Sequence, residues 1–250
     1  MILSHKHRFI FIKTVKTAGT SLEMALSRFC GPDDIITPIS PSDEATRRAH
    51  GHRGPQNFRY PVWQWPTVER RTLLYALYKK RLPFAFYNHM PAQAVRGMIG
   101  RDVWDSFYKF TVTRDPIDRI LSLYYWEREW SGFSGDFATF LRRRASQIDS
   151  HWRIVSENDR FMLDGFIRYE HLRSDLDRLG ERLNLPESLA EVFEGMSAKA
   201  GIRPQDATAD SLVGRDERAF VAYLCRPEIE AFGYPTETRA QPALAGDAKA

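Results

Sequence analysis

The sequence lacks the features that mark secreted, membrane-spanning or metal-binding chains. Its 250 residues include only two cysteines, Cys30 and Cys225, which lie far apart and in no metal-ligand spacing. A disulfide framework or a zinc ribbon is therefore not expected, and we expect both thiols to be buried as small hydrophobic side chains. No apolar run approaches the roughly 18 residues of a membrane-spanning helix. The first residues also lack the apolar stretch and cleavage site of a signal peptide, which predicts a cytoplasmic protein.

The chain also lacks a large excess of charge of one sign. The chain has 36 basic and 32 acidic residues and a net charge of +4. Such a mild excess suits an anionic ligand better than a nucleic-acid coat. Hydrophobic residues at 43% and charged residues at 27% are typical of a globular protein. We expect one domain over residues 1–240 and a flexible tail over residues 241–250.

Short apolar runs alternate with helical patterns along the chain. Strands are predicted at Phe9–Ile12, Phe84–Tyr87, Phe107–Thr113 and Met162–Tyr169, the first of them central. Helices are predicted after the first strand, over about 68–80, up to about residue 99, after Pro116 and over about 170–183. The segment from about residue 31 to 66 is predicted to be a long loop. This alternation indicates an α/β fold with a mostly parallel sheet.

The segment after the first strand, Lys16-Thr-Ala-Gly-Thr-Ser21, is rich in small and hydroxyl residues and leads into a helix. A helix N-terminus attracts anions, and small residues let a phosphate approach the peptide N–H groups. Lys16 precedes the single glycine, whereas in a nucleotide triphosphatase P-loop the lysine follows the glycines. The segment therefore favours a metal-free phosphate site. The alternative is a plain helix start capped by Thr20 or Ser21, with Lys16 solvated.

A second junction follows the strand that ends at Thr113. Arg114 comes first, and Ser122 lies eight residues on, about two helical turns away and on nearly the same face. Both side chains could address one phosphate, and Arg119 is expected to add a second charge nearby. The alternative is that Arg114 only pairs with Asp115 or Asp118.

Together these two segments resemble a paired signature. Phe11-Ile-Lys-Thr-Val-Lys-Thr-Ala-Gly-Thr-Ser21 and Val112-Thr-Arg-Asp-Pro-Ile-Asp-Arg-Ile-Leu-Ser122 are similar to the two motifs of sulfotransferases that use 3′-phosphoadenosine 5′-phosphosulfate (PAPS). The resemblance extends to Phe166–Leu172 and Arg226–Tyr234, and it is closest to the carbohydrate sulfotransferase branch. The sequence departs from the family in having Val15, where proline is frequent.

The resemblance implies a three-layer α/β sandwich related to the P-loop nucleotide kinases. It further implies a transfer of the sulfuryl group from PAPS to a hydroxyl acceptor, for which that family requires no metal. By position, Lys16 would contact the bridging oxygen and stabilise the leaving phosphate. Arg114 and Ser122 would hold the 3′-phosphate. The 5′-phosphate would lie against Thr17, Ala18, Gly19, Thr20 and Ser21.

Sulfuryl transfer also needs a base for the acceptor's proton, and His89 is our choice. It follows the predicted strand Phe84–Tyr87, at the edge where parallel sheets place their sites, and imidazole titrates near neutrality. Related carbohydrate sulfotransferases have a histidine or glutamate in this role. The alternative is a histidine that merely begins a helix beside Pro91. The reserve candidates are His50, His52 and Glu170.

The acceptor is expected to be a carbohydrate or glycolipid, with no nucleic-acid partner. An anionic sugar would suit the arginines and tryptophans of the long loop, which are Arg47, Arg48, Arg53, Arg59, Trp63 and Trp65. Lys199 and Arg203 loosely resemble the late basic loop that closes over the nucleotide in the family. Residues 142–144, three consecutive arginines, are predicted to be a solvated helix face. The oligomeric state stays open.

Two other functions compete with the sulfotransferase. A kinase-like phosphotransferase that uses ATP and magnesium would need a Walker-type loop and a metal-binding carboxylate, and the order of the loop residues argues against it. A non-catalytic module that binds a nucleotide or a polysaccharide would tolerate the loss of Lys16 and His89, whereas an enzyme would not.

Overall fold

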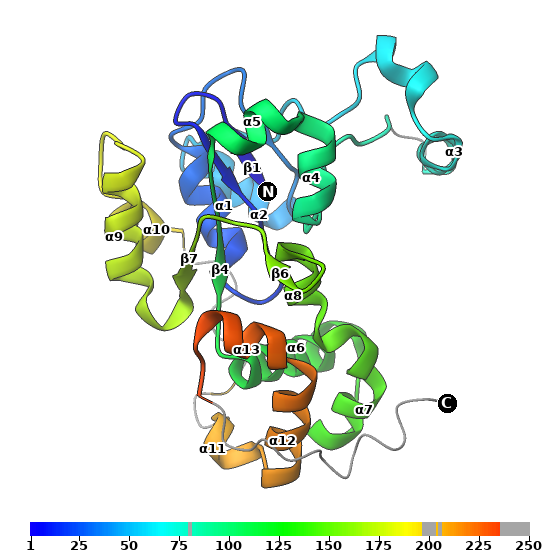
Figure 1. Ribbon diagram of the computed structural model, residues 1–250, viewed down its shortest axis with the longest axis vertical. Coiled ribbons are helices and arrows are strands. Elements are labelled where there is room, and N and C mark those ends of the chain that lie inside the picture. Colours follow the sequence, from blue (N-terminus) through cyan, green and yellow to red (C-terminus); the bar gives the residue numbers. More distant parts are fainter. Residues whose placement is uncertain (80–81, 197–203, 205–206, 236–250) are drawn as a thin grey trace.

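A computed structural model describes residues 1–79, 82–196, 204 and 207–235. At its centre lies a five-stranded sheet with the strand order β3-β1-β2-β4-β7 (Figure 1). The strands are β1 (Ile2–Ser4), β2 (Phe9–Phe11), β3 (Ile35–Ile36), β4 (Tyr108–Thr113) and β7 (Gly165–Arg168). β2 pairs in parallel with β4, and β4 with β7, whereas β1 is antiparallel to both of its neighbours. The sheet is thus mostly parallel, as predicted.

Helices cover both faces of the sheet. In β2, Phe9 and Phe11 pack with one layer of helices and Ile10 packs with the other, and all three are fully buried. One layer contains α1 (Gly19–Ser27), α9 (Leu172–Arg182) and α10 (Leu189–Glu194). The other contains α4 (Ala92–Ile99), α5 (Arg101–Ser106), α6 (Pro116–Ser131), α7 (Phe137–Ile148), α8 (Ser150–Val155), α12 (Arg215–Leu224) and α13 (Arg226–Phe232). Continuous apolar runs such as β2 are typical of strands that are buried on both faces.

Three of the four predicted strands are confirmed, and the first of them, β2, is the middle strand of the sheet. The prediction of a strand at Phe84–Tyr87 is wrong, because this run makes only an isolated bridge between Arg59 and Phe84. The N–H groups of Ala85 and Phe86 both donate to the Phe58 carbonyl, which satisfies them without a strand partner. Burial of an apolar run thus needs no sheet when nearby carbonyls accept its N–H groups.

The predicted long loop is also wrong in part, because residues 31–66 contain regular elements. These are β3, α2 (Pro41–Ala49) and most of the 3-10 helix η1 (Val62–Thr67). Ser40 caps α2 by accepting a hydrogen bond from the Asp43 N–H, and Pro41 occupies the first turn, so proline starts this helix rather than breaking it. The remaining short elements are the hairpin β5 (Ser156–Glu157) and β6 (Arg160–Phe161), the 3-10 helix η2 (Tyr169–His171) and α11 (Ala209–Leu212).

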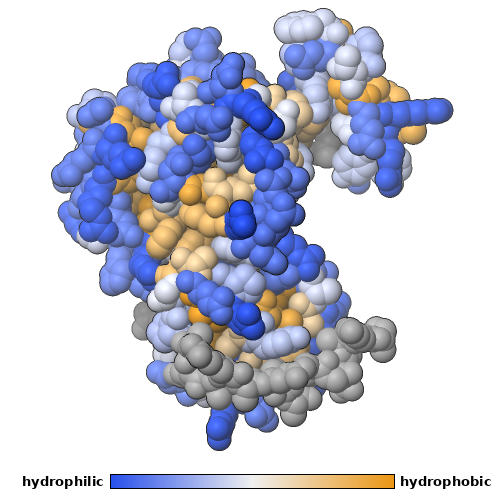
Figure 2. All heavy atoms as spheres, in the orientation of Figure 1, coloured by the Kyte–Doolittle hydropathy of each residue, from blue (hydrophilic) through white to orange (hydrophobic). Residues whose placement is uncertain are grey.

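An arm made of η1 and α3 (Arg70–Tyr78) stands away from the sheet (Figure 1), and α3 confirms the helix predicted near residues 68–80. Apolar side chains are exposed on this arm (Figure 2), including Val62 at 69% and Leu77 at 72%. Across the described parts of the chain, every helix is too short or too polar to cross a bilayer. Cys30 and Cys225 are buried free thiols, as predicted.

Candidate active site

The segment between β2 and α1 has an unusual backbone. Lys16 and Ala18 have φ angles of 61° and 58°, in the left-handed region that residues with a Cβ rarely adopt. Such conformations persist where the surrounding structure enforces them, and they cluster at ligand sites. The helix that follows has no side-chain cap at Ala18 and no acidic residue in its first turn. The amino end of α1 therefore has the character of an anion site.

Some helices of the described chain begin with a side-chain cap. Ser40, Asp115, Asp136 and Ser188 each cap the helix that follows by accepting a hydrogen bond from a backbone N–H. Side-chain caps of this kind satisfy orphan N–H groups within the protein itself. α1 shares the lack of such a cap with other helices, among them α4 and α12. The alternative of a helix start capped by Thr20 or Ser21 is disfavoured because Ala18 occupies the N-cap position.

A buried lysine supports the loop from beneath. Lys13 is 2% exposed, and its Nζ lies 2.9 Å from Glu23 Oε2. A Cβ added to Gly19 would lie 2.9 Å from Lys13 Cγ, closer than side chains pack, so this position requires glycine while Lys13 stays paired. Burial would raise the pKa of the Glu23 carboxyl, but the charges of Lys13 and its neighbours outweigh it and hold that pKa well below the ordinary value. The sequence alone gave no sign of this role for Lys13.

The side chain of Thr17 faces the interior. It is fully buried, and its hydroxyl lies 3.0 Å from the hydroxyl of Thr14. The Thr14 hydroxyl in turn donates to the Val112 carbonyl at 2.8 Å. Thr17 therefore has its backbone N–H, rather than its hydroxyl, to offer to an anion at this loop.

Arg114 joins the two motifs. Its Nη1 donates to the Lys16 carbonyl at 3.2 Å, and its Nε donates to Asp118 Oδ2 at 2.7 Å. The guanidinium carbon lies 4.0 Å from the centre of the Tyr169 ring. The ion pair with Asp118 that the alternative predicts is therefore present, but Arg114 also reaches the first loop, which a simple surface pair would not do. Cation–π stacking and two hydrogen bonds fix the orientation of this guanidinium.

The long helix α6 also lies beside Lys16. Lys16 Nζ lies 5.7 Å from the centre of the Trp126 ring on α6, and Ser122 is half-buried one turn earlier on the same helix. The expectation for Arg119 is wrong: it is 3% exposed and pairs with Glu228 at 2.8 Å, so it adds no free charge beside Arg114. Its side chain lies in the core, where Glu228 of α13 (Arg226–Phe232) pairs with it.

His89 lies beside the same loop. Its Nδ1 is 3.2 Å from the Lys13 carbonyl; because a carbonyl only accepts, Nδ1 donates and Nε2 is left as the basic nitrogen. Burial, together with the charge of Lys13, lowers the pKa of His89 to about 4. The strand that we expected before it is absent, so its contact with Lys13 comes from an irregular segment. His89 is half-buried, and its backbone has a φ of 60°, in the left-handed region.

The reserve bases lie in other surroundings. His50 is exposed at the end of α2, and the Nδ1 of His52 bonds to the Met24 carbonyl at 2.9 Å, on the side of α1. Burial lowers the pKa of His52. Glu170 accepts hydrogen bonds from the Asp115 N–H at 2.7 Å and the Tyr234 hydroxyl at 3.2 Å, so both of its oxygens are in use.

The arginines expected to meet the acceptor fall into two groups. Arg47 is fully buried, with Nη1 3.3 Å from Glu44 Oε1, so its expected contact with an acceptor is wrong. Arg48, Arg53 and Arg59 are exposed. Lys199 and Arg203 lie outside the described residues. Within the described residues, there is also no group of three or more His, Cys, Asp or Glu side chains arranged to hold a metal ion.

Comparison with known proteins agrees with this geometry. An uncharacterized protein of Archaeoglobus fulgidus is 25% identical over 104 residues, which cover 40% of this chain and 87% of that relative. Residues 1–234 match the profile of the Sulfotransferase family. This match spans the loop of Lys16, the junction of Arg114 and the position of His89. The chain belongs to the sulfotransferase family.

Proposed function

We propose that this protein transfers a sulfuryl group from PAPS to a hydroxyl acceptor, and that its fold is of the P-loop nucleotide-kinase type. The observation that supports this most strongly is the 3.2 Å contact between Arg114 Nη1 and the Lys16 carbonyl. It brings the two motifs together, although they lie 98 residues apart in the sequence. The candidate donor site thus lies at the start of α1. The loop of Lys16, the Arg114 guanidinium and the neutral His89 surround it.

The residues present fit the donor. PAPS carries anionic groups at both ends of its ribose, and the phosphosulfate would lie against the N–H groups of residues 17–21 at the uncapped start of α1. Gly19 keeps this helix start in place, because a Cβ there would clash with Lys13 Cγ at 2.9 Å. Arg114 and Ser122 would hold the 3′-phosphate, with the planar guanidinium suited to phosphate oxygens. When bound, PAPS supplies an activated sulfuryl group with a phosphate as leaving group.

In the transfer, two side chains of this protein do the work. His89, kept neutral by burial and by Lys13, accepts the proton of the acceptor hydroxyl at Nε2. Lys16 places its ammonium where negative charge builds up on the leaving phosphate. The half-buried setting of both residues reduces screening by water, which strengthens these electrostatic effects.

We propose a carbohydrate as the acceptor. Four exposed residues lie along this part of the chain: Arg48 near the end of α2, Arg53 and Arg59 between α2 and the arm, and Trp63 on the arm. Guanidinium groups bind anionic groups, and aromatic faces stack on sugar rings. This surface supports an anionic saccharide better than a small neutral alcohol.

The acid limb of the pH profile provides one prediction. A His89 pKa of about 4, below the ordinary value of 6.5, means that the ring stays neutral until the pH falls toward 4. We therefore expect kcat/KM to be constant from neutral pH down to about pH 5 and to fall near pH 4. A profile of initial rates, with circular dichroism at each pH to confirm folding, measures this. A limb centred near pH 6.5 would contradict it.

The transfer itself is tested with sulfur-labelled PAPS and a panel of acceptors. The panel would contain acidic oligosaccharides, neutral oligosaccharides, glycolipids and small alcohols, each with and without chelator. We expect label in the acidic saccharides at rates that the chelator does not change. Label in none of them, together with phosphate transfer from ATP and magnesium, would replace the sulfotransferase with a phosphotransferase.

A further inference from the structure

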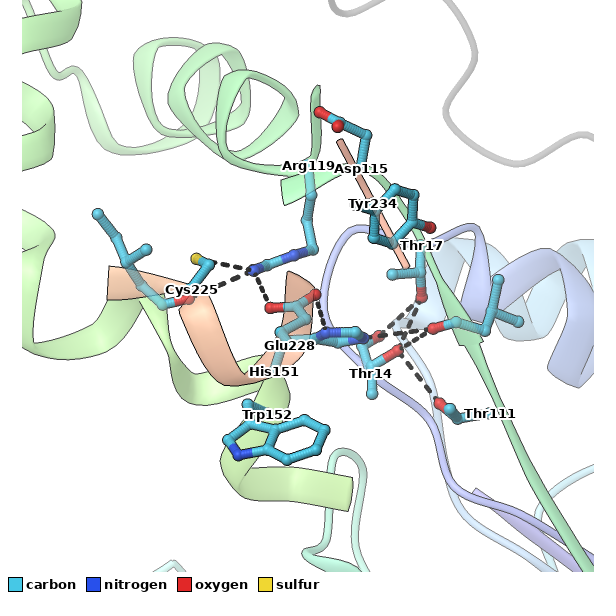
Figure 3. Close-up of polar contacts among 12 residues, drawn as sticks. Thr14, Thr17, Thr111, Asp115, Arg119, His151, Trp152, Cys225, Glu228 and Tyr234 are labelled. Atoms are coloured by element: carbon cyan, nitrogen blue, oxygen red, sulfur yellow. Dashed lines mark hydrogen bonds and ion pairs between the residues drawn. The ribbon is translucent and has the colours of Figure 1, made fainter. Parts of the chain in front are cut away.

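Three charged side chains from three helices meet in the interior. Arg119 of α6, His151 of α8 and Glu228 of α13 are 3%, 0% and 0% exposed. Arg119 Nη2 donates to Glu228 Oε2 at 2.8 Å, and His151 Nδ1 lies 2.5 Å from Glu228 Oε1 (Figure 3). Burial alone would raise the pKa of Glu228, but the charges of Arg119 and His151 outweigh it and lower that pKa. The carboxylate is thus fixed in place by two partners, Arg119 and His151.

Such a cluster is expensive to bury. Removing charges from water costs several kcal/mol per ion, and well-packed apolar side chains of similar volume often stabilise a core as well or better. Stability of the core is therefore a poor explanation for these three residues. Their contacts beyond the cluster indicate a different role.

His151 connects the cluster to the sheet. Its Nε2 lies 3.3 Å from the Val112 carbonyl near the end of β4, while its Nδ1 faces the Glu228 carboxylate. The ring is therefore held between two hydrogen-bond acceptors, the Glu228 carboxylate and the Val112 carbonyl. Arg119 in turn anchors Glu228. The orientation of His151 follows from these contacts.

The Val112 carbonyl connects His151 to the loop of Lys16. It also accepts the hydrogen bond of the Thr14 hydroxyl at 2.8 Å. Because the single proton of Thr14 is used there, Thr17 is the donor in the 3.0 Å contact between the two threonine hydroxyls. Figure 3 shows this path from Arg119 to Thr17. It ends between the two left-handed residues of the loop.

We propose that Arg119, Glu228 and His151 are positioning residues for the donor loop. They act through the Val112 carbonyl and Thr14 and keep Thr17, and with it the N–H groups at the start of α1, in the shape that receives an anion. This inference rests on the proposed function, because it assigns the cluster to the donor site. None of the three side chains touches the donor itself.

The test uses the least disruptive link in the path. Thr14→Val removes the hydroxyl and keeps the shape, and Thr14→Ser restores it. We expect Thr14→Val to weaken binding of 3′-phosphoadenosine 5′-phosphate about tenfold, the size of one lost hydrogen bond, and to lower kcat while the KM for the acceptor is unchanged. Thr14→Ser is expected to lie within about twofold of wild type. Calorimetry and initial rates measure these values well below each variant's unfolding temperature.

A double-mutant cycle tests the link to the cluster. His151→Gln keeps a donor toward Val112 but no charge, and Glu228→Gln is the substitute if the first variant does not fold. His151 and Thr14 both contact the Val112 carbonyl. We therefore expect the effects of His151→Gln and Thr14→Val on nucleotide affinity to be less than additive in the double variant.

Each outcome has one meaning. Wild-type affinity and rate in Thr14→Val, with only a lower unfolding midpoint, would overturn the positioning role and leave the proposed function intact. Additive effects in the cycle would separate the cluster from the loop and overturn it as well. If the wild-type protein binds no 3′-phosphoadenosine 5′-phosphate, the proposed function fails, and this inference fails with it.

Discussion

Replacing Lys16 with methionine should lower kcat for sulfuryl transfer about 10²–10³-fold, the usual effect of removing one preorganised group at a developing negative charge. Lys16 belongs to a loop whose backbone is already held by Arg114 and Lys13, so the variant should fold as wild type does. Binding of PAPS should weaken far less than kcat falls, because the leaving phosphate gains its full charge only as its bond to sulfur breaks. The product 3′-phosphoadenosine 5′-phosphate already carries that charge, so its affinity should fall more than that of PAPS. Initial rates with saturating PAPS measure the effect.

The matched control is Lys6→Met, which removes an exposed lysine beside the Phe29 carbonyl, beyond the other end of α1. We expect this control to have wild-type activity. Lys16→Arg keeps a positive charge of different shape and should fall between the two. An unchanged kcat in Lys16→Met would exclude charge stabilisation by this residue.

The second large effect is expected for His89→Asn. Asparagine retains a donor toward the Lys13 carbonyl, where His89 Nδ1 now donates, but it has no basic nitrogen in place of Nε2. We therefore expect kcat to fall about 10²–10⁴-fold, the range for loss of a general base. Nucleotide affinity should stay within about twofold of wild type, because no net hydrogen bond to the loop is lost.

A control for this variant is His50→Asn, since His50 is exposed at the end of α2. Its activity should equal that of the wild type. If His89→Asn also retains full activity at neutral pH, the base is another group. If His89 is the base, the low activity that remains in His89→Asn should no longer fall near pH 4, because the group that causes the acid limb is gone.

The parts of the fold that could be predicted from the sequence are those with a strong local pattern. β2 is a continuous apolar run, β4 (Tyr108–Thr113) is rich in aromatic and β-branched residues, and both junctions that follow have the residues of a helix start. The run at Phe84 shows the same pattern but satisfies its N–H groups on the Phe58 carbonyl. Whether an apolar run becomes a strand depends on partners far along the chain, which periodicity does not reveal.

In the candidate site, too, the residues within a local motif could be predicted and those defined by long-range contacts could not. Lys16, Gly19, Arg114 and His89 were predicted from motif and position, and the structure places Arg114 and His89 against the loop of Lys16. Lys13 was missed because its role comes from burial beside Glu23. Ten residues separate these two, and no local pattern indicates that they meet.

The buried partners were the hardest to predict. Arg47 and Arg119 are fully or nearly fully buried, yet an arginine in a sequence is most often exposed. Only the helix α13, more than a hundred residues after Arg119, provides the carboxylate that makes its burial tolerable. Long-range pairing of this kind is decided by tertiary packing.

The most direct test of the donor site is calorimetric titration of 3′-phosphoadenosine 5′-phosphate into the wild type, Arg114→Ala and Arg153→Ala. Arg153 is the control. Like Arg114, it pairs with an aspartate four residues away, but its side chain is exposed. We predict binding to the wild type and to Arg153→Ala that magnesium does not change, and binding about 10–100-fold weaker in Arg114→Ala, as for a lost hydrogen bond to a charged group. Binding of ATP with magnesium alone, or equal affinity in all three proteins, would contradict the account.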